Sequence, residues 1–250
     1  MSGKKLRLAA VAALAFALPA CSTAPSRNLD ENFSFTPDHQ DAATLCGNDK
    51  SCRPLTKGEI AEARKIFGDE INYSVIKVYK HPYYPTAPIK TLFGLSIFSS
   101  AESPNGNIYF RSMYTYKDDF SHDKKDLSVL LHELTHVWQK QKGVNLLFAA
   151  VSGYIKAGFD EDKTYKYDLD HSKRFSKLGI EQQGHIIEDY AELITRYDIE
   201  YGKSQLSDGD WLERHCEMIE KYEKKIGESL PVKPFPQCQN FEPDHFEPDF

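Results

Sequence analysis

The sequence lacks a run of basic residues that could follow the phosphates of a nucleic acid. Its formal net charge at pH 7 is −6, with 31 lysines and arginines against 37 aspartates and glutamates. Lys4, Lys5 and Arg7 lie in an N-terminal segment that we expect to be removed, which takes the net charge to −9. This acidic balance argues against nucleic acid as a partner.

The N-terminal apolar run is too short for a stable transmembrane helix. It covers Leu8–Leu18 and follows the basic residues, as is typical of a secretory signal peptide. The next residues, "LPAC", resemble a bacterial lipobox, which implies a signal peptide at 1–20, cleavage before Cys21 and acylation of Cys21. Ordinary signal cleavage at a nearby alanine is the alternative. By the same resemblance, Ser22 implies a lipid anchor in the outer membrane, on its periplasmic or surface face.

Cysteine is scarce, and the remaining cysteines do not have the C-x2-C spacing of many zinc sites. Without Cys21 an even number is left, in a chain expected to be exported, where thiols tend to oxidise. Three disulfide connectivities are possible for Cys46, Cys52, Cys216 and Cys238. We favour Cys46–Cys52 and Cys216–Cys238, because each pair closes a short local loop.

The rest of the chain predicts one domain after a tether. Residues 21–45 are polar with scattered proline, which favours a flexible tether before a single domain at 46–250. Composition and periodicity predict strands at 71–80, 91–100 and 107–114, and helices at 56–67, 121–143, 179–198 and 207–225. The apolar segment 144–159 is expected to be a helix over the core or a lid. These elements predict an α+β domain, with a small, mostly antiparallel sheet packed on helix 121–143 and a helical C-terminal half.

The stretch "LLHELTHVWQ", residues 130–139, holds two histidines four apart with Glu133 beside the first. A chain of this composition would contain H-E-x-x-H by chance only about 0.02 times. On a helix, His132 and His136 lie roughly 40° apart, on the side away from the apolar residues. Two such imidazoles can bind one zinc ion, and the neighbouring carboxylate can accept a proton from a water at the metal. The alternative is a surface helix whose histidines take no part in chemistry.

Helix 179–198 carries an acidic stripe. Glu181, His185, Glu188 and Glu192 lie on one side of it, opposite its apolar residues. Carboxylates at this spacing repel one another unless something positive lies near them. The stripe is therefore a candidate for the missing metal ligand, and a solvated surface is the alternative.

HExxH followed by a glutamate on a later helix resembles the gluzincin branch of the zincin metallopeptidases. The match is closer to the bacterial Rhs- or VgrG-related metallopeptidase family, and it is carried by "PLTKGEIAEARKIFGDEINYSVIKV", "NGNIYF", "LLHELTHVWQKQKG" and "IEQQGHIIEDY". The resemblance implies a zincin-like fold, one zinc ion per chain held by His132, His136 and Glu181, Glu133 as the base, and association with a secretion system. His185 stands where an acid is often found four residues after the ligand glutamate. Glu188 or Asp189 could take over that second role or serve as an alternative ligand.

The resemblance implies an envelope-anchored zinc metallopeptidase that hydrolyses peptide bonds in a peptide or protein substrate. An oxyanion would need a further donor, for which Tyr167, His171, Arg174 and Tyr190 are unranked candidates. An exposed strand at 107–110 is expected to hold the substrate by β-addition. Two alternatives stay open. One is a non-catalytic zinc-binding lipoprotein of the envelope or a secretion system, and the other is a peptidoglycan amidase or endopeptidase acting on cell-wall peptide.

Overall fold

The computed structural model describes residues 42–86, 101–112, 115–160, 162–171, 173–203 and 209–239. The chain divides into two compact units, Met1–Asp38 with Tyr84–Phe98, and His39–Tyr83 with Ser99–Phe250. Apart from the short helix η2 (Tyr84–Thr86), the described residues belong to the second unit. The expected signal peptide, the lipidation site Cys21, most of the tether and the strand expected at 91–100 lie outside the described residues.

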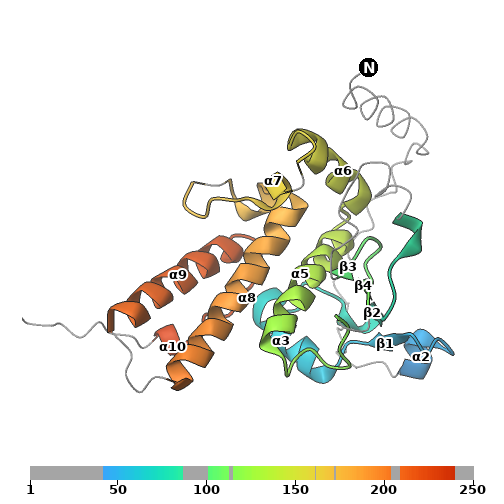
Figure 1. Cartoon of the computed structure of the whole chain (residues 1–250), viewed down its shortest axis with the longest axis horizontal. Coiled ribbons are helices and arrows are strands. Elements are labelled where there is room, and N and C mark those ends of the chain that lie inside the picture. The colour runs from blue at the N-terminus through green and yellow to red at the C-terminus, as the bar shows by residue number, and fades with distance from the viewer. Residues whose placement is uncertain are drawn as a thin grey trace, which may run out of the picture. The chain divides into compact units, whose positions relative to one another are not determined.

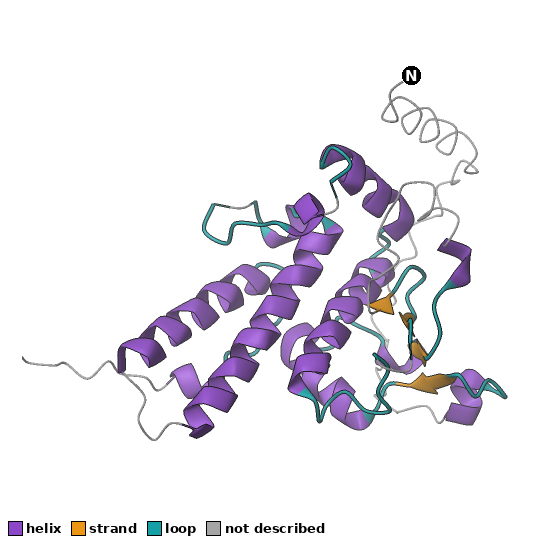
Figure 2. Cartoon of the chain, in the orientation of Figure 1, coloured by secondary structure: helices purple, strands orange, loops and turns teal. Residues whose placement is uncertain are grey.

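The second unit combines four short strands with helices (Figures 1 and 2). The strands are β1 (Cys52–Pro54), β2 (Lys77–Tyr79), β3 (Ala101–Glu102) and β4 (Ile108–Phe110). The α-helices are α2 (Ala42–Cys46), α3 (Lys57–Phe67), α5 (Lys124–Gln141), α6 (Leu146–Lys156), α7 (Asp162–Tyr165), α8 (Ile180–Lys203), α9 (Gly209–Gly227) and α10 (Pro236–Gln239). Two single-turn 3-10 helices, η1 (Tyr73–Val75) and η3 (Phe175–Lys177), complete it. The expected α+β class with a helical C-terminal half is confirmed.

The strands form one mixed sheet in the order β1-β2-β4-β3. β1 pairs with β2, and β3 with β4, in antiparallel fashion, but β2 and β4 pair in parallel at the centre. Along the chain, β3 comes after β2 and before β4. In the sheet, however, β4 lies between β2 and β3. The expectation that residues 107–110 form an exposed edge is therefore wrong. Among the described strands, β3 is the edge beside β4.

The strand expected at 71–80 covers only Lys77–Tyr79. Upstream of it, the Asn72 side chain accepts hydrogen bonds from the backbone N–H and the hydroxyl of Ser74, at 3.2 and 2.7 Å. Such local bonds compete with extended structure, and here they turn Tyr73–Val75 into a 3-10 turn. The β-branched and aromatic composition therefore predicted too long a strand.

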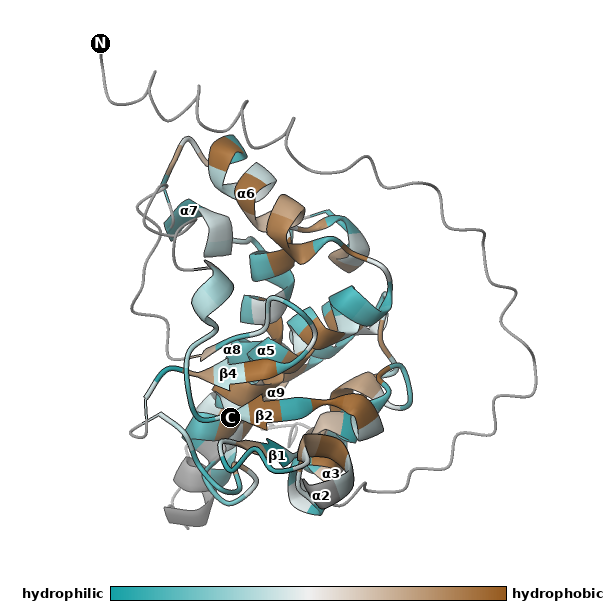
Figure 3. Cartoon of the chain, turned by 90° about the vertical axis from the view of Figure 1, so that its right-hand side faces the viewer, coloured by the Kyte–Doolittle hydropathy of each residue, from teal (hydrophilic) through white to brown (hydrophobic). Residues whose placement is uncertain are grey.

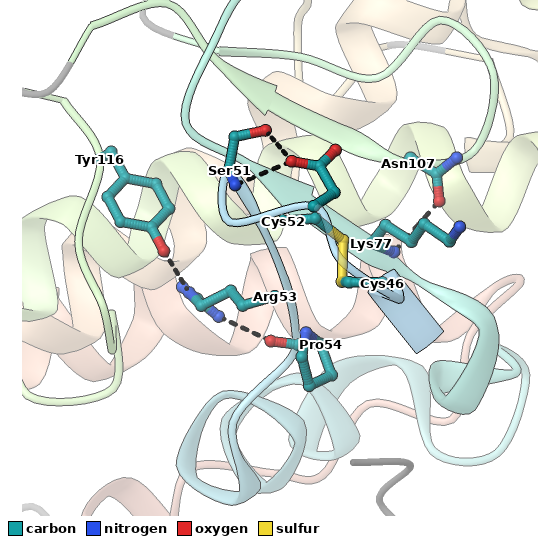
Figure 4. Close-up of a disulfide and its surroundings, with 9 residues drawn as sticks. Cys46, Ser51, Cys52, Arg53, Pro54, Lys77, Asn107 and Tyr116 are labelled. Carbon is teal, nitrogen blue, oxygen red and sulfur yellow. Dashed lines mark hydrogen bonds between the residues drawn. A yellow bond between two sulfur atoms is a disulfide. The ribbon is translucent and has the colours of Figure 1, made fainter. Parts of the chain in front are cut away.

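A buried ion pair fixes the start of the domain. The guanidinium of Arg53 donates to both carboxylate oxygens of Glu59, at 2.8 and 2.7 Å. It also donates to the Tyr116 hydroxyl at 3.1 Å, as Figure 4 shows. Glu59 also completes the capping box with Thr56 that the sequence predicts at the start of α3. Because Glu59 is fully buried and bidentately paired, it holds β1, α3 and the loop before α5 together.

Helix α5 is the centre of the core. β3, β4 and α3 contact it on the sheet side, and α8 runs beside it along the opposite side (Figure 1). Fully buried side chains fill the sheet side, including Leu130 and Leu134 of α5 and Ile108 and Phe110 of β4. α9 then packs on α8 and extends the helical half. Burial on both sides of α5 sets the surroundings of the histidine motif.

The apolar segment at 144–159 forms α6, capped by the Asn145 side chain, which accepts from the Phe148 backbone N–H at 3.1 Å. Figure 3 shows largely apolar residues along this helix. α6 contacts α5 and α8, while Phe148 remains mostly exposed. No helix among the described residues has both the length and the hydropathy needed to cross a membrane.

Both expected disulfides are present. Cys46 of α2 is bonded to Cys52 of β1 (Figure 4), and Cys216 of α9 is bonded to Cys238 of α10. The second bridge is supported by a hydrogen bond from the Phe235 backbone N–H to Glu223 of α9, at 2.6 Å. The bridges therefore fasten the two ends of the described chain to their neighbouring elements.

We expect the two bridges to differ in their effect on stability. Removing Cys216–Cys238, which spans 22 residues, by Cys216→Ala with Cys238→Ala should lower the free energy of unfolding by about 3 kcal/mol. Removing Cys46–Cys52, which spans 6 residues, should lower it by about 2 kcal/mol, because the shorter loop constrains the unfolded chain less. Denaturant unfolding of the two double variants measures the order, and a larger loss for Cys46–Cys52 would contradict it.

Candidate metal centre

Helices α5 and α8 bring His132, His136 and Glu181 together. The Glu181 carboxylate lies 3.5 Å from Nε2 of His132 and 3.3 Å from Nε2 of His136. One potential ligand atom from each residue lies within 4.8 Å of the others. Two atoms bound to one tetrahedral zinc at its usual bond lengths are separated by about 3.4 Å, so the carboxylate distances suit a shared ion.

The histidines are buried, with 9 % of His132 and 8 % of His136 exposed. Sequence periodicity places them opposite the apolar side of α5, and in the structure α8 covers that side. The expectation of a surface helix, given above as the alternative, is therefore wrong. Polar residues face inward here because a second polar surface, that of α8, lies against them.

The Glu188 carboxylate of α8 accepts a hydrogen bond from Nδ1 of His132 at 2.9 Å. This bond fixes the proton on Nδ1 and leaves Nε2 directed toward Glu181. Glu188 follows Glu181 by seven residues, so both carboxylates lie on the same side of the helix. Glu188 thus contacts the centre by orienting a histidine, while Asp189 lies outside it and accepts a hydrogen bond from Tyr167.

His136 is oriented by an amide instead of a carboxylate. Its Nδ1 donates to Oε1 of Gln139 at 2.9 Å, and Nε2 of Gln139 donates to Oε1 of Gln183 at 2.8 Å. Gln183 in turn donates to the Phe175 carbonyl at 2.9 Å. Both glutamines are buried, so this chain of hydrogen bonds ties the ring of His136 to the segment that precedes α8.

Gly184 lets the two helices approach closely at His132. A Cβ atom built on Gly184 would lie 2.9 Å from both Cε1 and Nε2 of the His132 ring. Any larger residue would push the ring away from Glu181, because contacts this short do not occur between real side chains. The glycine in "EQQGH" therefore serves the histidine and has no role in a turn.

Glu133 lies beside the histidines and is 5 % exposed. Its Oε2 atom is buried and has no hydrogen-bond partner among the described residues. Burial raises the pKa of Glu133 above its ordinary value, although the neighbouring histidines oppose the shift. A buried carboxylate oxygen without a partner is costly unless a bound group supplies one.

The charges of the metal-free cluster are strongly coupled. Burial lowers the pKa of His132, but hydrogen bonds to Glu181 and Glu188 outweigh it and raise the pKa to about 10. Burial likewise opposes charge on Glu181, yet the two histidines hold its pKa far below the ordinary value. Without an ion, the histidines therefore supply the positive charge that these carboxylates need.

The donor set fits a divalent metal ion. Two imidazole nitrogens and one carboxylate oxygen converge, which is a His₂Glu combination typical of catalytic zinc sites. Each histidine also has the outer hydrogen-bond partner that metal-binding histidines usually have. These three residues could hold the ion, and Glu133 would lie beside it with a free carboxylate oxygen.

The remaining expected residues lie outside the cluster. Tyr190 donates to Glu223 at 2.9 Å, and His171 is exposed and paired with Asp168 on its own loop. Arg174 precedes η3 and is also exposed. The Tyr167 hydroxyl donates to Asp189 and is hydrogen-bonded to the Tyr222 hydroxyl. None of these four oxyanion candidates makes a hydrogen bond to the three clustered residues in the described part of the chain.

Sequence reasoning missed Gln139, Gln183 and Gly184. All three lie inside the stretches that carry the family resemblance, "HELTHVWQ" and "EQQGH". Gln139 is one turn after His136, which is the only local sign of its role. The other two act across the helix interface, and a single sequence does not show that interface.

Comparison with known proteins ties the chain to VgrG-related proteins of type VI secretion systems. No family model matches the sequence. The spike protein VgrG2b of Pseudomonas aeruginosa is 36 % identical over 140 residues, which cover 55 % of this chain and 13 % of the spike protein. The solved effector domain of Pseudomonas aeruginosa VgrG2b is 26 % identical, with a TM-score of 0.49 over 78 % of this chain and 89 % of that domain. The sequence similarity confirms the VgrG part of the resemblance.

Gly184→Ala is expected to weaken zinc binding at least about tenfold, because the new Cβ would displace the His132 ring. The matched control is Gly153→Ala in α6, where no atom lies within 4 Å of the added Cβ. Alanine is the better helix former by about 1 kcal/mol, so the control should bind zinc normally and be no less stable. Titration against a competing chelator measures both affinities. Equal affinities would show that the close approach is unnecessary.

Proposed function

We propose that this chain is a zinc-dependent hydrolase that cleaves peptide bonds, with a zincin-like arrangement of α5 and α8, and that it is associated with a secretion system. The observation that carries the catalytic part is the position of Glu133. Its buried carboxylate, with one oxygen unpartnered, lies next to the only group of histidines and carboxylates in the described residues suited to a metal ion. A site built solely for structure needs no such base.

His132, His136 and Glu181 would hold the ion, with Glu188 and Gln139 keeping the two rings in the orientation that presents Nε2. Zinc, when bound, would polarise the scissile carbonyl and acidify a water molecule. Glu133 would accept the proton of the attacking water and pass it to the leaving amine.

The secretion-system part rests on sequence similarity to VgrG2b, a spike protein of a type VI secretion system. The matched region is 13 % of that spike protein, so this chain corresponds to one part of it. The lipobox resemblance adds a lipid anchor at Cys21 and an envelope location. Together these two resemblances favour a protein that works with such an apparatus at the cell envelope.

A non-catalytic zinc-binding lipoprotein of the same apparatus is the second candidate. The sequence similarity to VgrG2b supports it better than it supports a hydrolase, because the similarity concerns a secretion-system protein and names no catalysis. A peptidoglycan amidase or endopeptidase would use the same residues on cell-wall peptide. Hydrolysis that depends on Glu133 would distinguish a hydrolase from the non-catalytic lipoprotein. The substrate that is cleaved would distinguish a peptidoglycan enzyme from a peptidase acting on proteins.

We expect purified residues 22–250 to bind about one zinc ion per chain, because three donors converge on one point. His136→Ala and Glu181→Ala should each abolish stoichiometric binding. Glu192→Ala is the matched control, since Glu192 lies on the same stripe of α8 outside the clustered residues and accepts a hydrogen bond from Ser128 at 3.4 Å. Metal analysis after dialysis measures occupancy, and full occupancy of the His136→Ala variant would refute the site.

Glu133→Gln should retain zinc and lose hydrolysis at least about 100-fold, because an amide cannot accept the proton of the attacking water. Turnover of casein and of isolated muropeptides by the zinc-loaded protein measures the effect. Wild-type rates in the variant would exclude Glu133 as the base. Zinc binding without turnover of any substrate by the wild type would favour the non-catalytic alternative.

A further inference from the structure

A cavity of about 600 Å³, widely open to solvent, lies on α8 outside the metal centre. It is lined by α7 and the residues after it on one side and by α8 on the other. The lining residues are Asp162, Tyr165, Lys166, Tyr167, His185 and Asp189. None of them belongs to the group that could hold a metal ion, and the volume is ample for an amino-acid side chain.

The cavity is within reach of a substrate bound at the metal centre. His185 lies one helical turn after Glu181, about 6 Å along the axis. Asp189 lies two turns after Glu181, about 12 Å along the axis. The same residues are rotated by about 40° and 80° from Glu181, so the cavity flanks the metal-facing stripe. An extended peptide advances about 3.3 Å per residue. The side chain of a residue about two to four positions from the cleaved bond would therefore reach it.

Contacts among three segments hold the cavity wall. The Tyr167 hydroxyl donates to Asp189 of α8 and bonds with the Tyr222 hydroxyl of α9 at 2.8 Å. The rings of Tyr165 and Tyr167 approach the His185 ring edge-on, with centroids 5.8 and 6.0 Å away. The tyrosines are thus fixed in place beside α8.

The charges of the cavity favour a cation. Asp162 and Asp189 contribute two carboxylates against one ammonium, that of Lys166, whose residue is exposed. Asp189 uses Oδ2 for the Tyr167 bond, while its Oδ1 accepts no hydrogen bond within the described residues and lies 3.9 Å from Nε2 of His185. Aromatic rings next to carboxylates are the surroundings that bind ammonium and guanidinium groups.

We propose that this cavity is a subsite for a cationic side chain of the substrate, a primary amine or a guanidinium, bound by Asp189 and Asp162 beside the two tyrosines. The inference rests on the proposed hydrolase function and names the substrate class of that same site. Lysine residues of proteins and the diamino acid of cell-wall stem peptides both offer such an amine. The shared chemistry is the free, protonated amine.

The first experiment compares cleavage of peptides that differ at one position near the scissile bond. Wild-type protein loaded with zinc should show a kcat/KM about tenfold higher for lysine than for norleucine, which has the same length without the charge. Asp189→Asn should bring this ratio close to one, while its amide oxygen can still accept the Tyr167 hydrogen bond. Glu217→Gln on the exposed side of α9 removes the same charge elsewhere and should keep the ratio. A ratio of one in the wild type, or preference for glutamate, would overturn the proposal.

A second experiment separates this proposal from the proposed function. Binding of the same peptides to zinc-loaded Glu133→Gln, measured by fluorescence anisotropy, should show the same preference without cleavage. If the wild type cleaves nothing, the hydrolase proposal fails, and the binding preference alone decides the subsite. A parallel pair of stem peptides, with the diamino acid amine free or acetylated, identifies the source. If the free amine is preferred only in the stem peptides, the substrate is cell-wall peptide. If it is preferred in both sets of peptides, polypeptides are substrates as well. If it is preferred in neither set, the subsite is refuted.

Discussion

Helix α8 places two carboxylates, Glu181 and Glu188, against two imidazoles on the inner side of α5, and Glu133 adds a third carboxylate from α5 itself. Buried charges are costly unless they are paired. No lysine or arginine in the described part of the chain pairs with these acids, so the two histidines, whose pKa values the carboxylates raise, are their partners of opposite charge when no metal is bound. A divalent ion would take over that positive charge. The packing of the two central helices and the proposed binding of a metal ion thus depend on the same side chains.

The two histidines are oriented by different means. His132 donates to a carboxylate on the helix that supplies Glu181, so one element controls both. His136 donates to Gln139, and the hydrogen bonds continue through Gln183 to the carbonyl of Phe175. A neutral amide adds no charge to a cluster already rich in carboxylates, and its direction is set by the segment before α8. The geometry of His136 therefore depends on residues far from it in sequence.

The elements that depend on local periodicity were predicted well from the sequence. The long amphipathic helices appear close to their expected limits, with α8 continuing to Lys203, beyond the expected end at 198. Both disulfides were predictable because each closes a short loop. The strand predicted at 71–80 was too long, because the Asn72 side chain accepts a hydrogen bond from the Ser74 backbone and turns the chain. The position of β4 inside the sheet depends on non-local pairing, which composition does not reveal. In the site, the histidines and Glu181 were found from their motif, whereas Gly184 and Gln183 matter only once α5 lies against α8.

Neither disulfide joins α5 to α8. One links α2 to β1 and the other links α9 to α10, so the covalent cross-links lie at the two ends of the described chain. The contact between the two central helices therefore rests on side-chain packing and hydrogen bonds, without a covalent link between them. The disulfides act instead on the outer elements, each of which they fasten to a neighbour in the chain.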